Sequence, residues 1–90
     1  MFKTLEELIT IIRQRKGFKI EESYTKKLLN NKKLSTEKVK EEIAELIDAI
    51  EKNTNKVHEA ADVLYHLMVL LETNGIKIED VMDELKKRQK

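Results

Sequence analysis

Cysteine and proline are absent from this 90-residue chain, and glycine occurs only twice. Without cysteine the chain has neither a disulfide framework nor a thiolate metal site, which is consistent with a reducing compartment. No apolar run approaches the roughly 18 residues that a membrane crossing needs, and the N-terminus lacks the basic-then-apolar plan of a signal peptide. We therefore expect a soluble, cytoplasmic protein that does not contact a membrane.

The opposite charges nearly cancel, because 18 lysines and arginines stand against 17 acidic residues and give a net charge of +1. This balance argues against a protein that binds nucleic acid through bulk electrostatics. Hydrophobic residues make up 40% of the composition, which is enough to form a core and excludes wholesale disorder. We expect one domain over residues 1–90, and since so short a chain buries only about 60% of its unfolded surface, we expect self-association.

The charges are nevertheless segregated along the chain. Residues 1–40 hold 11 basic and 5 acidic side chains, whereas residues 41–62 hold 2 basic and 7 acidic ones. A basic block followed directly by an acidic block suggests two surfaces with different tasks.

The spacing of apolar residues by three and four predicts helices throughout, and no segment shows the alternation of a strand. We expect an all-α fold of four to five helices, completed as a helical bundle by homodimerisation. The predicted helices cover residues 5–16, 23–30, 36–53, about 56–73, and a last amphipathic segment around 78–85.

Particular residues predict where these helices begin and end. Thr4 and Glu7 have the spacing of a capping box at the start of the first helix, and Gly17 follows its end. Ser35 is the expected N-cap of the third helix, after a loop over residues 30–33. Residues 53–55, Asn-Thr-Asn, predict the break between the third and fourth helices.

The fourth helix differs in kind, since 11 of its 15 residues from Val57 to Leu71 are apolar and they lie around its whole circumference. Such a helix is expected to be buried on most sides. Glu59, Asp62 and His66 lie on one stripe of this apolar helix. An uncompensated buried carboxylate costs several kcal/mol. The two acids must therefore be paired, protonated or bound to a metal. For His66 we favour a hydrogen-bonded packing role over a ligand role.

Acidic residues on the third helix offer a partner for this stripe. Glu42 and Glu45 are three residues apart with Glu41 beside them, and the short loop makes the two helices antiparallel neighbours, so that the acids face Glu59 and Asp62. Four converging carboxylates repel unless a divalent cation binds them. Ligands that are all oxygen favour Mg²⁺, Mn²⁺ or Ca²⁺ over Zn²⁺. Because Mg²⁺ usually keeps positions open for water and substrate phosphates, the site points to phosphate-ester or pyrophosphate chemistry. Taken alone, the glutamates of residues 41–45 are more typical of a solvated helix face than of a metal site, and it is their combination with Glu59 and Asp62 that favours the metal.

The pattern Glu-Glu-Ile-Ala-Glu at residues 41–45, followed 13 residues later by Glu-Ala-Ala-Asp at residues 59–62, resembles the all-α nucleoside triphosphate pyrophosphohydrolase superfamily. Within it the chain resembles the phosphoribosyl-ATP pyrophosphohydrolase family, because Ser-Tyr-Thr at residues 23–25 and the extension of the second motif to Tyr-His-Leu at residues 65–67 are specific to that family. Lys40 departs from the family, which usually has glycine there. The resemblance covers roughly residues 4–88.

The resemblance implies a Mg²⁺-dependent hydrolysis, with Mn²⁺ as the alternative ion, of the α–β phosphoanhydride of phosphoribosyl-ATP to phosphoribosyl-AMP and pyrophosphate. This is the second step of histidine biosynthesis. By carry-over, Glu42, Glu45, Glu59 and Asp62 bind the metal, and Glu41 is a further ligand or orients the attacking water; Glu41, Glu42 and Glu45 form the catalytic set. The family also implies a homodimer in which helices of both subunits form one bundle.

The basic block then supplies candidate phosphate ligands: Arg13, Arg15, Lys16 and Lys38. Lys38 is the strongest of these because it lies one turn before Glu42 on the same helix face, whereas a solvated role is an equal alternative for the other three. Tyr24 either contacts the substrate or packs. Two other functions stay open: a house-cleaning pyrophosphohydrolase of (deoxy)nucleoside triphosphates, and a non-enzymatic helical interaction domain whose acids are surface charge.

Overall fold

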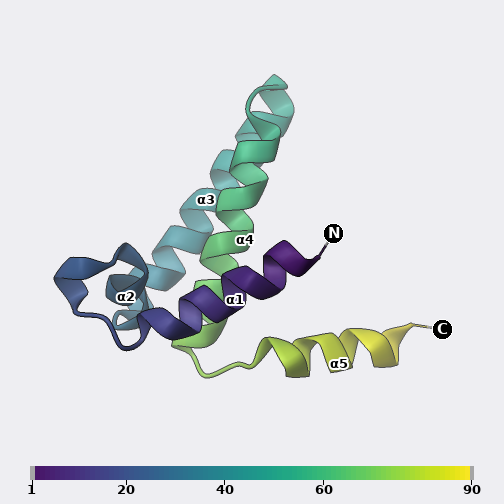
Figure 1. The fold of residues 1–90 in the computed structure, drawn as a ribbon. Coiled ribbons are helices and arrows are strands. Elements are labelled where there is room, and N and C mark those ends of the chain that lie inside the picture. The colour runs from purple at the N-terminus through teal and green to yellow at the C-terminus, as the bar shows by residue number, and fades with distance from the viewer. Residues whose placement is uncertain (1, 90) are drawn as a thin grey trace.

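The computed structural model describes residues 2–89, and within them all regular secondary structure is helical, which confirms the predicted fold class. Figure 1 shows a long hairpin of two helices, α3 and α4, with the two N-terminal helices gathered near one end and α5 running away from it beside α1. None of the described helices is apolar over the length that a bilayer crossing requires. The elements in order are α1 (Lys3–Arg15), a 3₁₀ turn η1 (Ile20–Glu22), α2 (Tyr24–Leu29), α3 (Lys32–Lys52), α4 (Lys56–Thr73) and α5 (Ile78–Arg88).

The turn between α3 and α4 uses two asparagines in left-handed backbone conformations. Asn53 has φ 55° and Asn55 has φ 43°, and asparagine adopts this region more readily than most residues with a Cβ atom. The predicted break at residues 53–55 and the predicted helix over 56–73 are both confirmed. Because the connection is so short, α3 and α4 pack antiparallel along much of their length.

The main core lies at the end of the hairpin opposite the α3–α4 turn, where α1 and α2 pack against α4. Ile12 of α1, Leu28 of α2 and Met68 and Val69 of α4 are buried against one another. Ser35, at the base of α3, is only 2% exposed, and its hydroxyl donates a 2.6 Å hydrogen bond to the carbonyl of Leu28. Apolar packing therefore joins α1 and α2 to α4, and the buried hydrogen bond of Ser35 joins α3 to α2.

Two predicted helix starts are wrong. α1 begins at Lys3 after Phe2, which supplies no side-chain cap, so Thr4 lies inside the first turn and forms no capping box with Glu7. α3 begins at Lys32, four residues earlier than predicted, because the side chain of Asn31 accepts a hydrogen bond from the backbone of Leu34.

Three more residues lie near predicted or observed helix boundaries: Ser23, Gly17 and Ser35. Ser23, predicted as the first residue of the second helix, is instead its N-cap: its side chain accepts a hydrogen bond from the backbone of Lys26 at 3.3 Å, and α2 begins at Tyr24. Gly17 lies in the turn that follows Arg15, so the first helix ends one residue earlier than expected. The N-cap assigned to Ser35 instead belongs to Asn31, since Ser35 lies within the first turns of α3 and points into the core.

The expectation that α4 is buried on most sides is wrong for the single chain. Val57 is 85% exposed and Leu64 is about half exposed, while the buried residues of α4 lie in its C-terminal half. A partner helix covers only one face of a helix, and along the hairpin α3 is the partner. The large apolar side chains left exposed on the hairpin are spaced by three, four and seven along their helices, so those of each helix lie on one face of that helix. We call these residues together the apolar side of the hairpin: Ile43, Ile47, Ile50, Val57 and Leu64.

Candidate functional site

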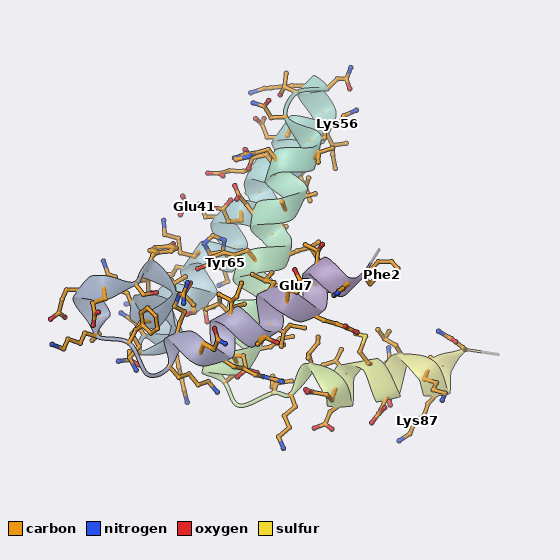
Figure 2. All side chains as sticks on the ribbon, in the orientation of Figure 1. Phe2, Glu7, Glu41, Lys56, Tyr65 and Lys87 are labelled. Atoms are coloured by element: carbon orange, nitrogen blue, oxygen red, sulfur yellow. The ribbon has the colours of Figure 1, made fainter. Side chains whose placement is uncertain are left out.

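Two groups of potential metal ligands lie opposite one another in the hairpin. Glu41, Glu42 and Glu45 of α3 place one carboxylate oxygen each within 4.8 Å of one another. His58, Glu59 and Asp62 of α4 do the same with one ligand atom each. Figure 2 labels Glu41 part of the way along the hairpin, below its tip near Lys56.

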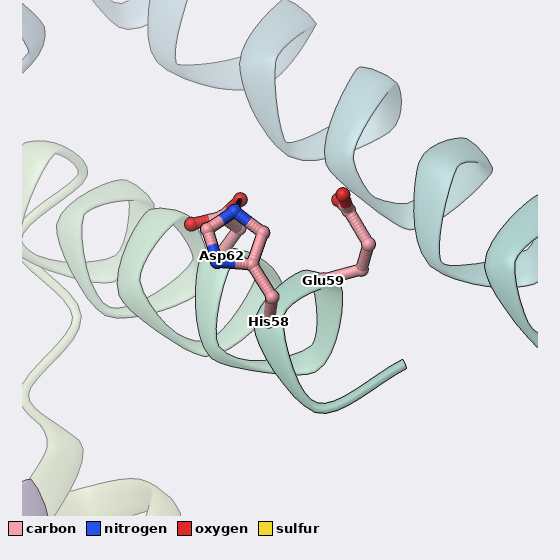
Figure 3. A group of neighbouring side chains, drawn as sticks. All are labelled: His58, Glu59 and Asp62. Atoms are coloured by element: carbon pink, nitrogen blue, oxygen red, sulfur yellow. Dashed lines mark ion pairs between the residues drawn. The ribbon is translucent and has the colours of Figure 1, made fainter. Parts of the chain in front are cut away.

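Figure 3 shows how the α4 group is arranged. The Glu59 side chain extends toward α3, whereas the His58 ring lies beside the Asp62 carboxylate. His58 Nε2 is 3.4 Å from Asp62 Oδ2. The one-turn spacing of these two residues and the i, i+3 spacing of Glu59 and Asp62 place all three on neighbouring faces of the helix.

The Glu45 carboxyl connects the two groups. Burial is the main cause that raises the pKa of Glu42, and the adjacent Glu45 raises it further. Glu59 behaves alike: burial raises its pKa, and the negative charges of Glu45 and Asp62 add to the effect. Glu45 therefore lies against one acid from each helix, and the structure brings together all four carboxylates that the sequence places on facing helices.

These carboxylates have the properties of an ion site. One oxygen of Glu42 and one of Glu59 are buried and have no hydrogen-bond partner. Within residues 2–89, no lysine or arginine forms an ion pair with Glu42, Glu45 or Glu59. Buried carboxylate oxygens without a protein cation are costly unless something else compensates them. A hard divalent cation, which prefers oxygen ligands, fits this donor set.

An open cavity of about 430 Å³ adjoins the cluster. Glu41, Glu45 and Glu59 line it, together with Thr54 and Asn55 from the turn between the helices. The carboxylates are therefore accessible to a ligand from this side, and the turn that joins α3 to α4 forms part of the wall.

Of the predicted phosphate ligands, Lys38 is near the cluster. Its ammonium group lies 3.4 Å from Glu41, and the hydrogen bond to Glu41, together with the negative charge of that carboxylate, raises the pKa of Lys38. Lys38 is thus placed at the edge of the acidic group, one turn before Glu42, as the sequence predicts.

Arg13, Lys16 and Arg15 are not brought to the carboxylates within one protomer. Arg13 and Lys16 contact Glu72 at 2.8 and 2.7 Å. At a rise of 1.5 Å per residue, Glu72 is roughly 20 Å along α4 from Glu59. The guanidinium of Arg15 lies over the ring of Phe18 at 4.6 Å from its centroid, as a cation–π contact.

Tyr24 is connected to the site by a hydrogen bond to His66. Its hydroxyl is 3.2 Å from Nε2 of His66, and the other ring nitrogen of His66 lies 2.9 Å from the backbone carbonyl of Asp62. Partial burial raises the pKa of Tyr24, while the nearby Lys38 lowers it. His66 is buried, so the predicted hydrogen-bonded packing role is confirmed, and the structure adds its link to Tyr24.

His58 is the potential ligand that the sequence reasoning missed. It precedes Glu59 directly and stands four residues before Asp62, a spacing at which two helical side chains can share one ion. That spacing was the available signal, but the side chain is largely exposed, and surface histidines are common without a metal.

Comparison with known proteins identifies a family of similar sequences. The profile of a family described as phosphoribosyl-ATP pyrophosphohydrolase matches residues 5–89. A phosphoribosyl-ATP pyrophosphatase of Methylobacterium nodulans is 46% identical over 94% of this chain and 82% of its own length. One from Sulfurisphaera tokodaii is 45% identical over 96% of this chain and 95% of its own length.

The same similarity extends to a longer protein. A histidine biosynthesis bifunctional protein HisIE of Pyrococcus furiosus is 44% identical over 96% of this chain, but this chain spans only 41% of that relative's length. No solved structure is a significant match to the chain.

Proposed function

This chain belongs to the phosphoribosyl-ATP pyrophosphohydrolase family, and from that premise we propose that it hydrolyses phosphoribosyl-ATP to phosphoribosyl-AMP and pyrophosphate in histidine biosynthesis. The observation that carries the proposal is the facing set of carboxylates with two buried oxygens that lack a partner. A triphosphate substrate brings a divalent cation with it, so such a site is suited to this chemistry.

Glu42, Glu45, Glu59 and Asp62 would hold Mg²⁺, or Mn²⁺ in its place, with His58 beside them as a further donor. The bound ion would neutralise the triphosphate and lower the pKa of an attacking water. Glu45 has the central position, because its carboxyl lies against an acid of each helix. We expect Glu42 and Glu45 to be indispensable members of the catalytic set for this reason.

Two residues at the edge of the cluster would act on the substrate itself. Glu41 is exposed and borders the cavity, so its carboxylate can accept a hydrogen bond from the attacking water and orient it. Lys38 would place its ammonium group against a phosphate, releasing the ion pair with Glu41 that it forms in the free protein. The oxygen of Tyr24 lies on the same side, near Lys38 and Glu42.

The functional unit would be a homodimer. The apolar side of the hairpin exposes five large side chains that α3 and α4 do not cover for each other. Contiguous apolar surface of this kind marks an interaction site on a small protein. A second copy that covers it would form a bundle of hairpins and leave the carboxylates accessible on the other side.

The experiment that tests the proposed function is a substrate comparison. Pyrophosphate release is measured with phosphoribosyl-ATP and with a panel of nucleoside and deoxynucleoside triphosphates, each with Mg²⁺ and with chelator. We expect clear preference for phosphoribosyl-ATP and no release with chelator. Preference for the panel would indicate a house-cleaning pyrophosphohydrolase, and no release from any compound would indicate an interaction domain.

A pair of conservative variants tests the site. Glu45→Gln and Asp62→Asn keep size and hydrogen-bonding capacity but remove one negative charge each, so we expect turnover to fall at least 100-fold with the helical circular dichroism unchanged. Glu51→Gln, an exposed change on the same helix as Glu45, is the control and should retain full activity. An active Glu45→Gln or Asp62→Asn enzyme would remove that residue from the proposed site.

A further inference from the structure

The hydrogen bonds of His66 fix which of its ring nitrogens carries the proton. A backbone carbonyl can only accept, so the 2.9 Å contact between His66 Nδ1 and the Asp62 carbonyl requires a proton on Nδ1. In a neutral imidazole the other nitrogen is then an acceptor. His66 Nε2 therefore accepts from whatever lies opposite it, and that group is the hydroxyl of Tyr24 at 3.2 Å.

This assignment determines what the Tyr24 oxygen can offer to a ligand. A phenol has one proton to donate, and here it is committed to His66. The lone pairs of the oxygen remain, so Tyr24 presents an acceptor and no donor. The contact is held in place because His66 is buried and its ring also packs edge-on against Tyr65, with centroids 4.9 Å apart.

The Tyr24 oxygen is also available to a ligand. The residue is 49% exposed and stands at the start of α2, while its partner His66 lies within the molecule on α4. The charged groups that act on Tyr24 include Lys38, Glu42 and Glu41, which belong to the edge of the carboxylate site. The acceptor therefore lies at the border of the site rather than among its ligands.

We infer that Tyr24 selects the nucleoside part of the substrate: its oxygen accepts a hydrogen bond from a hydroxyl of a ribose or from an amino group of the base, and His66 is the positioning residue that sets this polarity. Phosphate oxygens are acceptors at neutral pH, so an acceptor facing them gains nothing. The inference rests on the proposed function for the identity of the substrate, but it narrows the role of Tyr24 to a group other than the phosphates.

The first test reads the tautomer directly in the free, full-length protein. Long-range ¹H–¹⁵N correlation spectra of the imidazoles distinguish a protonated ring nitrogen from an unprotonated one. We expect His66 to show a protonated Nδ1 and an unprotonated Nε2, and we expect Tyr24→Phe to shift the Nε2 resonance while Nδ1 stays protonated. A protonated Nε2 would overturn the inference, because Tyr24 would then be free to donate.

The second test compares two ligands that share the phosphates. For Tyr24→Phe, we expect KM for phosphoribosyl-ATP to rise about five- to tenfold, the value of one lost hydrogen bond, with kcat within about twofold. Inhibition by inorganic tripolyphosphate, which has no nucleoside, should be unchanged. Equal weakening of tripolyphosphate and substrate would show that Tyr24 contacts phosphate and would overturn the inference.

Matched variants complete the design. Tyr65→Phe removes the neighbouring tyrosine hydroxyl, which pairs with Thr25 instead of His66, and should leave KM unchanged. If His66→Gln folds, the double variant with Tyr24→Phe should lose no more than the larger single loss, since both act through one contact. Complete lack of turnover by the wild-type protein would count against the proposed function alone, and the imidazole spectra would still decide the polarity of Tyr24.

Discussion

At the scale of single residues, the acids of the hairpin work against the stability of the free protein. Glu42 and Glu59 are held with raised pKa values by burial and by the neighbouring Glu45, so at neutral pH the folded chain contains repulsion that the unfolded chain does not. The proposed cation site would account for this repulsion, because carboxylates arranged to bind a cation repel one another when the cation is absent.

The first prediction concerns Glu45, whose charge faces acids on both helices. In chelator, Glu45→Gln should raise the melting temperature by a few degrees, because it removes the repulsion between Glu45 and the acids at positions 42 and 59. Saturating Mg²⁺ should raise the melting temperature of the Glu45→Gln variant much less than it raises that of the wild type. Thermal denaturation with and without Mg²⁺ measures both, and Glu51→Gln serves as the exposed control. A stable wild type that Mg²⁺ does not affect would contradict the metal site.

The second prediction is that the stability depends on pH with opposite signs in chelator and in Mg²⁺. Carboxyls whose pKa is raised by folding bind protons more tightly in the folded state, so their favourable contribution is present below about pH 4.5 and is lost as the pH rises through the raised value. Urea denaturation in chelator should therefore show stability increasing from pH 7 to pH 5. With Mg²⁺ the trend should reverse, because protons compete with the ion. Glu45→Gln should flatten the slope in chelator.

At the scale of helices, the ion pairs of Arg13 hold α5 against the rest of the molecule more than apolar packing does, since α5 has no buried residue. Arg13 of α1 makes a bidentate contact with Glu79 of α5, at 2.9 and 2.7 Å, and a third contact with Glu72 of α4. The guanidinium lowers the pKa of Glu79 to about 2. Burial would raise the pKa of Glu72, but Lys16 and Arg13 outweigh it, so the value is lowered. Arg13, predicted as a phosphate ligand, here connects three helices.

The third prediction follows from this connection. Arg13→Gln removes the bidentate contact and leaves Glu72 with Lys16, so α5 should detach while the α3–α4 hairpin stays formed. Amide hydrogen exchange should become at least tenfold faster over residues 78–88 and change little over 56–73. Arg88→Gln, which removes only a 3.5 Å contact within α5, is the control.

Acid should reproduce the effect in the wild-type protein. The lowered pKa values of Glu72 and Glu79 mean that their contribution is present above about pH 4.5 and is lost as the pH falls toward 2. Exchange of α5 that is equally slow in Arg13→Gln and in the wild type would show that packing alone holds this helix.

Helix boundaries show what the sequence could and could not determine at this scale. The break at residues 53–55 was predictable because asparagine favours the left-handed backbone conformations found there. The start of α3 was not, since Asn31 and Ser35 are both good N-caps by type. The choice depends on tertiary structure: Ser35 is needed inside the helix, where its hydroxyl reaches the Leu28 carbonyl.

At the scale of the whole molecule, the hairpin has two unlike sides. Positions 41, 45 and 48 of α3 carry acids, whereas 43, 47 and 50 carry isoleucine, and helical geometry directs these two sets to different faces. On α4 the acids at positions 59 and 62 and the exposed apolar residues at 57 and 64 are likewise separated. The chain thus separates the surface that we propose for the ligand from the surface that we propose for a second copy.

The fourth prediction tests the apolar side. Ile47, about half exposed at its centre, should be covered in the homodimer, so Ile47→Asp should convert a dimer into a monomer of lower stability. Sedimentation equilibrium of the wild type and the variant measures this directly. Lys33→Asp changes charge at an exposed position outside the apolar side and should remain dimeric. A monomeric wild type at concentrations that support full activity would contradict the proposal.

The sequence determined the fold class and the acidic pairing, because both depend on local spacing within two adjacent helices. It could not place Arg13, Lys16 or Tyr24, because their surroundings come from contacts 40 or more residues away in the chain, such as Tyr24 with His66 and Arg13 with Glu72. The expected burial of α4 rested on composition alone, and composition does not say whether the same chain or another one provides the cover.

The short turn between α3 and α4 has a consequence for the order in which the chain folds. All four proposed metal ligands lie within residues 42–62, on two helices joined by three residues, so the ligand set requires no long loop to close. Contacts between near neighbours in sequence form fastest. The cation site should therefore assemble early, before α5 docks. A divalent cation present during refolding should accelerate the formation of the α3–α4 hairpin, and not only slow its unfolding.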